Sequence, residues 1–154
     1  MLLIAVLSLS LYGHPPRLPA RVGPWQIEGR PDRFAGTRVC AISAAGVGLH
    51  RDVLVFRAER RGDTRQALFR IDGGAPRPVA EAFDAAEDHG FFPQRGWIIN
   101  PDGGEVVLPA AFAYGARTIT IRSRLGRLPR RFNIARLNDA LAIAASAGCA
   151  AEVP

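Results

Sequence analysis

The residues best suited to acid and base chemistry lie together in the segment EDHGFF, as Glu87, Asp88 and His89. A carboxylate beside an imidazole can exchange protons with a substrate, so these side chains are candidates for general acid and base catalysis. The same residues also suit a solvated loop between a helix and a strand. We favour the solvated loop.

Other chemical motifs are missing from the sequence. His14 lies in the N-terminal segment, which leaves too few histidines for a three-histidine metal site. The paired glycines at 73–74 and 103–104 lack the spacing of a phosphate-binding loop and are explained by turns. The serines beyond the N-terminal segment have no G-x-S-x-G context: Ser43, Ser123 and Ser146. We therefore predict a protein that is not an enzyme and that uses no metal and no cofactor.

A cluster of arginines near the C-terminal end is the best candidate for a binding surface. It consists of Arg122, Arg124, Arg127, Arg130 and Arg131. Guanidinium groups bind phosphate and carboxylate through paired hydrogen bonds, which suits lipid headgroups, lipopolysaccharide or an acidic partner protein. The cluster lacks aromatic residues for base stacking, so nucleic acid is not the expected partner.

The alternative for this cluster is a charged loop without a partner. All 20 basic residues of the chain are Arg, which gives a net charge of +6 and is typical of a GC-rich genome. In that case, part of the positive charge results from the base composition of the genome and not from a function of the protein.

Two cysteines, Cys40 and Cys149, are the only ones in the chain. In an exported protein, two cysteines have one intramolecular solution, a disulfide between them. The alternative is two buried thiols that are not connected, as in many cytosolic proteins.

The first 20 residues, MLLIAVLSLSLYGHPPRLPA, predict export. Their apolar run from Leu2 to Leu11 resembles the core of a secretory signal, with cleavage possible after Gly13 or Ala20. The run is shorter than the roughly 20 apolar residues of a membrane span. A short uncleaved anchor, or a buried N-terminal strand or helix, remain as alternatives. We expect a periplasmic or secreted protein, with residues 1–20 as the signal or anchor.

Residues 21–154 are predicted to form a single, mainly β domain, an antiparallel β-sandwich or partly open barrel. The 16 glycines and 12 prolines divide the chain into short elements. The segments RRGDTR and PDGG are predicted to be hairpin turns, and Gly46 and Gly48 are expected to end a strand. Strands are expected over residues 22–29, 37–43, 52–59, 66–72, 97–100, 105–109 and 117–124.

Two helices are predicted, a short one over residues 79–90 and a longer one that packs on the sheet near the C-terminus. For the longer helix, Asn133 is the expected N-cap and Gly148 the expected stop. Its buried stripe is predicted to be Ile134, Leu137, Leu141 and Ala144. If this stripe docks on the face of the strand that carries Cys40 and Ile42, the two sulfurs come together.

The order of these segments resembles the invasion-associated locus B family and similar small exported proteins of α-proteobacteria. The resemblance covers most of the chain from Trp25 to Cys149, including VLVF, FRIDGG, GGEVVLPAAFAYGARTITIR and FNIARLNDALA. It implies a periplasmic, β-sandwich-like domain without known catalytic residues.

The function expected from these observations is that of a non-enzymatic exported protein that binds an envelope component or partner protein. One alternative is an accessory subunit of a membrane complex, held by an uncleaved N-terminal anchor. Another is a small enzyme that uses His89 with Asp88 or Glu87.

Overall fold

A computed structural model describes residues 16–82 and 103–150 of the protein, which form two β-sheets. The larger, seven-stranded sheet contains β1 (Ala20–Val22), β2 (Trp25–Asp32), β3 (Thr37–Ala44), β4 (Val47–His50), β5 (Val53–Arg57) and β8 (Glu105–Pro109), in that order, with β11 (Cys149–Ala150) paired to β3. The four-stranded sheet has the order β10 (Arg130–Asn133), β9 (Thr118–Arg122), β6 (Leu68–Ile71) and β7 (Arg77–Pro78). The helical segments among the described residues are one turn over residues 79–82, where the predicted short helix begins, a 3-10 turn η2 (Ala110–Ala113) and α2 (Leu137–Ser146).

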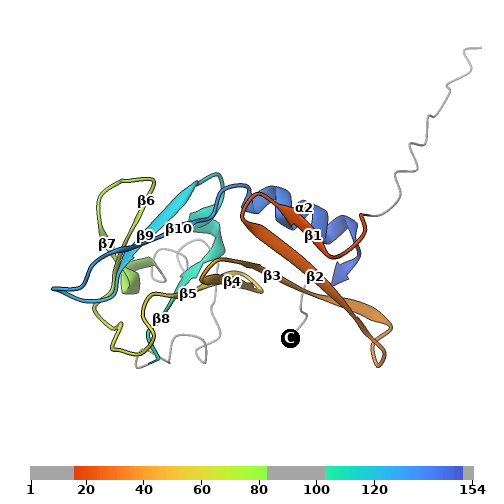
Figure 1. Ribbon diagram of the computed structural model, residues 1–154, viewed down its shortest axis with the longest axis horizontal. Coiled ribbons are helices and arrows are strands. Elements are labelled where there is room, and N and C mark those ends of the chain that lie inside the picture. Colours follow the sequence, from red (N-terminus) through yellow and green to blue (C-terminus); the bar gives the residue numbers. More distant parts are fainter. Residues whose placement is uncertain (1–15, 83–102, 151–154) are drawn as a thin grey trace, which may run out of the picture.

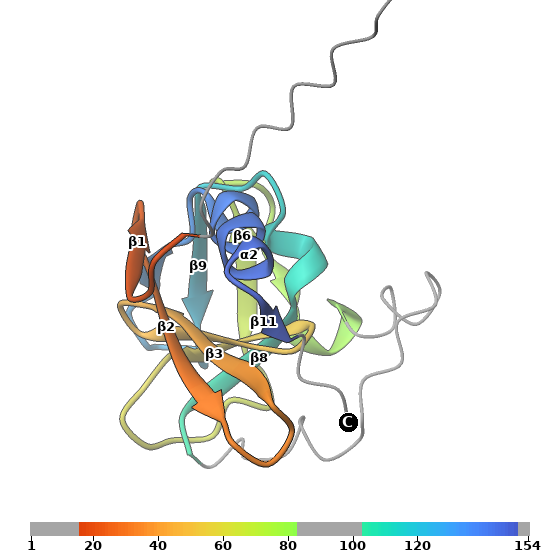
Figure 2. The ribbon, with the colours of Figure 1, turned by 90° about the vertical axis from the view of Figure 1, so that its right-hand side faces the viewer.

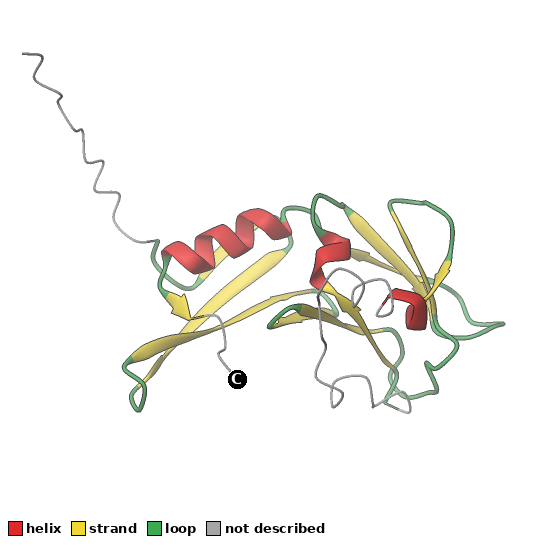
Figure 3. Ribbon diagram, turned by 180° about the vertical axis from the view of Figure 1, so that it is seen from behind, coloured by secondary structure: helices red, strands yellow, loops and turns green. Residues whose placement is uncertain are grey.

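The small sheet and α2 lie side by side over the same face of the large sheet (Figure 1). The small sheet covers the part formed by β4, β5 and β8, and α2 lies along β1 and β2. Figure 2 shows β11 beside β3 below the helix, and Figure 3 shows the same layers from behind. The prediction of a mainly β, sandwich-like fold with one C-terminal helix packed on a sheet is therefore confirmed.

The core is the space between the large sheet and its two covers. Across the large sheet, Ile42 lies opposite Leu49, Leu49 opposite Leu54, and Leu54 opposite Leu108, so these residues share the inner face. Under the small sheet, the rings of Phe56 and Phe132 meet edge to face at 5.1 Å.

Under α2, the buried indole of Trp25 donates hydrogen bonds from Nε1 to the carbonyl oxygens of Ile134 and Ala135, at 3.4 and 3.1 Å. Trp25 thus joins β2 to the segment that leads into the helix. The helix buries Leu137, Ala140 and Ala144 against this part of the sheet.

The predicted hairpin between residues 52–59 and 66–72 is wrong. Strand β5 pairs with β4 and β8 in the large sheet, whereas β6 pairs with β7 and β9 in the small sheet. The residues between them cross from one sheet to the other and do not form a tight turn. The Thr64 hydroxyl donates a hydrogen bond to the carbonyl oxygen of Glu105 and ties this crossing to β8.

Two further expectations about chain boundaries are corrected. Gly46, with φ +77°, is part of the turn between β3 and β4, and Gly48 lies inside β4 instead of ending a strand. Asn133 does not cap α2, because its side chain accepts a hydrogen bond from the backbone N–H of Ala135 and the helix starts after Arg136.

The predicted helical stripe is correct in part. Leu137 and Ala144 are buried on the helix and Ile134 is buried just before it, but Leu141 is only half-buried. Gly148, with φ +75°, follows the end of the helix as expected.

Several predictions lie outside the described residues. These are the apolar run within residues 1–15, the helix over 79–90 beyond residue 82, the strand over 97–100 with the first two residues of its PDGG turn (101–102), and the group Glu87, Asp88 and His89. Of the last residues in the predicted signal, Ala20 pairs with Ile27 and Leu18 packs against the core.

Candidate functional site: an arginine hairpin

The two cysteines form a disulfide, as predicted. The Cys40 and Cys149 sulfurs are 2.00 Å apart and the Cα atoms 5.5 Å apart, across a sequence separation of 109 residues. The bond joins β3 to β11, and the Arg38 guanidinium supports the same junction by donating a hydrogen bond to the carbonyl oxygen of Ala147. The C-terminal end is thereby fastened to the large sheet.

The predicted arginines all belong to one β-hairpin, which we call the arginine hairpin. It consists of β9, β10 and the turn between them, residues 123–129, which we call the arginine turn. Arg122 ends β9, Arg130 and Arg131 begin β10, and Arg124 and Arg127 lie in the arginine turn. Hairpin pairing therefore brings the predicted cluster together.

The arginines divide between the two faces of this hairpin. On the outer face, Arg131 lies opposite Thr120 and Thr120 lies opposite Arg70 of β6, so the three residues form one row across the small sheet. Neighbouring strands are about 4.8 Å apart, so the strands carrying Arg70 and Arg131 are about 10 Å apart. Arg122, two residues from Thr120 on β9, lies on the same face.

On the opposite face of the hairpin, Arg130 is exposed but is held against the body of the protein. Its guanidinium lies over the ring of Phe132, 5.4 Å from the centroid, and donates a hydrogen bond of 2.6 Å to the carbonyl oxygen of Arg57. Arg130 is therefore better suited to fixing the hairpin on β5 than to binding a partner.

The arginine turn is anchored by Glu59, a residue that the sequence did not suggest. The hydroxyl of the buried Ser123 donates a hydrogen bond to the Glu59 carboxylate, and Arg127 Nε lies 3.6 Å from Oε1 of the same carboxylate. Within the turn, the N–H of Arg127 donates to the carbonyl oxygen of Arg124 at 3.3 Å. The turn thus has a defined conformation although it extends from the body.

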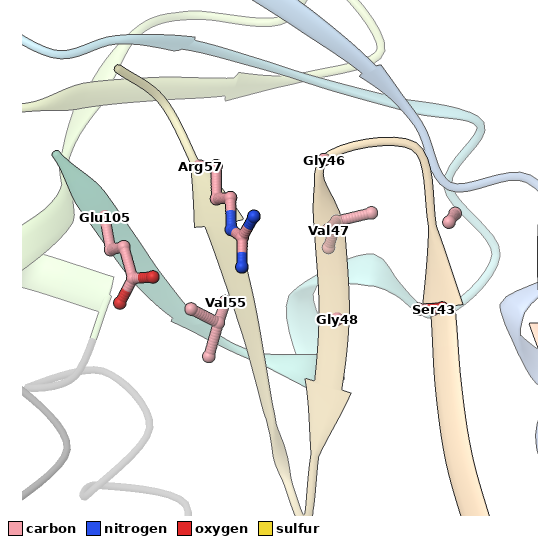
Figure 4. Close-up of a pocket in the computed structure, with 8 residues that line it drawn as sticks. Ser43, Gly46, Val47, Gly48, Val55, Arg57 and Glu105 are labelled. Carbon is pink, nitrogen blue, oxygen red and sulfur yellow. The ribbon is translucent and has the colours of Figure 1, made fainter. Parts of the chain in front are cut away.

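A second candidate site is a pocket of about 300 Å³ on the outer face of the large sheet (Figure 4). It lies over β4, where Gly48 has no side chain and where a Cβ would meet nothing within 4 Å. Val55, Arg57 and Glu105 line one side and Ser43 the other. These groups could hold a small polar molecule, but the pocket lining contains no pairing of a nucleophile with a base.

The described part of the chain shows neither a metal-binding cluster nor a membrane-spanning helix. Across residues 16–82 and 103–150, no group of three or more His, Cys, Asp or Glu side chains is placed to hold a metal ion. None of the helices in these two ranges is long and apolar enough to cross a membrane.

Sequence reasoning missed three kinds of residue at the arginine hairpin. Arg70 was overlooked because β6 was expected to pair with β5, and only the pairing with β9 places it beside Arg131. Glu59 comes from a distant crossing segment. Leu125 and Leu128 are highly exposed in the arginine turn, and their positions between arginines were a signal available in the sequence.

Comparisons of the chain with protein-family models, with curated proteins and with solved structures find no match.

Proposed function

We propose that the protein is a non-enzymatic exported protein that works in the periplasm or outside the cell by binding an anionic component of the envelope. The arginine hairpin is the binding surface. The observation that carries this proposal is the exposed outer face of the small sheet, where Arg70, Arg122 and Arg131 surround Thr120 beside the arginines of the turn. Guanidinium and hydroxyl groups on one face are suited to phosphate or carboxylate oxygens.

The disulfide supports the part of the proposal that concerns location. Disulfides persist in the periplasm and in other oxidising compartments, and they are rare in the cytosol of mesophiles. The apolar segment within residues 1–20 agrees with export.

The test replaces Arg124 and Arg131 with Gln, because both side chains are exposed and neither is the residue that fixes the hairpin on β5. We expect weaker association with envelope fractions and a flatter dependence on salt, since exposed charge contacts are screened over about 8 to 10 Å at ordinary ionic strength. The measurement is co-sedimentation of the full chain with envelope fractions at several salt concentrations.

The matched control replaces Arg30 and Arg33 with Gln, which removes the same charge from the exposed end of β2 and from the turn that follows it. This variant should behave as the unaltered protein. Equal losses in both variants would show a general effect of net charge and would contradict a binding surface at the arginine hairpin.

A further inference from the structure

Two leucines are almost fully exposed in the arginine turn. Leu125 is 84% exposed and Leu128 is 90% exposed, with Arg124 and Arg127 beside them in the sequence. In the described part of the chain the turn forms one end of the long axis, while the turn between β2 and β3, with Phe34, lies at the other end (Figure 1).

The exposure of these leucines is built into the fold. Ser123 and Arg127 both contact the Glu59 carboxylate, and Gly126 adopts a φ of +81° within the turn. Arg130 fastens the following strand to the carbonyl oxygen of Arg57. The turn is therefore anchored at both of its ends while Leu125 and Leu128 extend away from the core.

Apolar side chains among arginines fit the boundary between water and a lipid bilayer. At such a boundary, alkyl groups enter the acyl region while guanidinium groups remain at the level of the anionic phosphates. A standard protein interface buries about 800 Å² on each partner, more than a short projecting turn provides. Binding to an acidic protein would need only the charge of the arginines, and the two exposed leucines would then have no role.

We propose that the anionic component is the surface of a phospholipid bilayer, into which Leu125 and Leu128 insert while Arg124 and Arg127 contact lipid phosphates. This inference rests on the proposed function and names the class of its partner. The orientation follows from the fold: the arginine turn meets the bilayer, and the turn that carries Phe34 points away from it.

The test uses the full chain with tryptophan placed at either end of the molecule, as Leu125→Trp and Phe34→Trp. Phe34 is fully exposed, so the two variants place equivalent probes at the two ends. Each is mixed with vesicles of phosphatidylcholine and phosphatidylglycerol that carry brominated acyl chains. We expect the added fluorescence of Leu125→Trp to shift to the blue and to be quenched, and that of Phe34→Trp to stay unchanged.

Affinity is measured with a second pair of variants. The double variant Leu125→Ser with Leu128→Ser should lower partitioning onto anionic vesicles by about tenfold or more, because two inserted alkyl groups are lost. The control Phe34→Ser removes an equally exposed apolar side chain at the far end and should leave partitioning unchanged. Circular dichroism and thermal unfolding of each variant establish that the fold is retained.

The residues before 21 are the same in every variant, so any contribution that they make to vesicle binding cancels in the comparison. The lipid inference would be overturned if Leu125→Trp is not quenched on vesicles that bind the protein. It would also be overturned if Phe34→Trp is quenched instead. If envelope association still depends on Arg124 and Arg131 while Leu125→Trp stays unquenched, the proposed function stands with an acidic protein as partner. If neither charge nor leucine variants change association, both proposals fail.

Discussion

The Asp72 carboxylate fixes the register on which the row of outer arginines depends. It accepts hydrogen bonds from the backbone N–H groups of Arg117 and Thr118, and the N–H of Asp72 donates to the carbonyl oxygen of Thr118. These contacts join the end of β6 to the start of β9. A shift of one residue here would move every side chain of the pair to the other face, so Asp72 keeps Arg70 in the row with Thr120.

The first prediction at this scale concerns the pH dependence of stability. The hydrogen bond from Thr118 N–H, with further bonds from Arg117 N–H and the Thr118 hydroxyl, lowers the pKa of Asp72 below its ordinary value of 3.8. A carboxyl with a lower pKa in the folded state stabilises the fold above its unfolded pKa, and this stabilisation is lost as the pH falls through the folded pKa. Replacing Asp72 with Asn should therefore lower stability at neutral pH, with a difference that shrinks in acid.

Urea unfolding of both proteins between neutral pH and about pH 2 measures this difference. Asn also tolerates the positive φ of 47° at this position, so the substitution changes the charge without straining the backbone. Parallel stability curves across the whole pH range would show that the Asp72 charge does not contribute.

Single residues of the site were predictable where their chemistry is independent of the fold. Cys40 and Cys149 had one intramolecular partner each, and the five arginines are close in the sequence, so hairpin pairing was enough to gather them. Arg70 and Glu59 were not predictable, because a pairing between distant strands brings Arg70 to the site and a crossing between sheets brings Glu59.

At the scale of elements, alternation of apolar and polar residues identified most strands, while their pairing remained undetermined. Strand β9 has the predicted pattern, with Ile119 and Ile121 buried and Thr118, Thr120 and Arg122 outward. Turn residues such as those of RRGDTR show where a strand ends, but they do not specify which sheet the next strand joins. The crossing from β5 to β6 depends on contacts with β8, which lies some forty residues further along the chain.

Gly48 illustrates the same limit, because its place in the sheet depends on strand pairing. Because glycine is typical of turns, the sequence predicted that Gly48 ends a strand. In the structure Gly48 lies within β4 and leaves space for the pocket. Replacing Gly48 with Val should fill the pocket without a clash, because a Cβ meets nothing within 4 Å. We expect stability to be unchanged or to rise by up to about 1 kcal/mol, since a β-branched residue suits a strand better than glycine.

Envelope association of Gly48→Val should also be unchanged, because the arginine hairpin and not the pocket is proposed to bind the partner. The matched control is Gly104→Ala, where φ is +76° and a Cβ would lie 2.8 Å from the Glu59 carbonyl oxygen. That variant should lose about 1 kcal/mol or more. A loss of association in Gly48→Val with an intact fold would assign the binding site to the pocket.

At the scale of the molecule, the large sheet is covered by the small sheet and by α2, which come from different parts of the chain. The small sheet is built from the middle and later parts of the chain, and the other cover is α2, over residues 137–146. The disulfide fastens the second cover, since Cys149 directly follows Gly148 and joins β3. The sequence indicated this connection because the helical stripe, the glycine and the cysteine follow one another, although the exact pairing of β11 with β3 could not be foreseen.

The last prediction concerns this disulfide, whose removal should loosen the helical cover while the small sheet keeps its own pairing. Cys40 and Cys149 are 109 residues apart, and the chain-entropy model gives such a loop about 4 to 5 kcal/mol. Losses of about 2 to 5 kcal/mol are usual when a native disulfide is removed, which corresponds to a lower melting temperature by roughly 5 to 15 °C in a domain of this size. Reduction should produce this shift, and the variant Cys40→Ala with Cys149→Ala should melt lower and no longer respond to reductant.

The same bond tests where the protein resides. Protein taken directly from cells into an alkylating reagent should resist modification until it is reduced, because a compartment that permits disulfides has already joined the two sulfurs. The double alanine variant is the control for alkylation at other groups. Two thiols that react at once in freshly isolated protein would place the chain in a reducing compartment and would contradict export, whatever the arginine hairpin binds in a purified system.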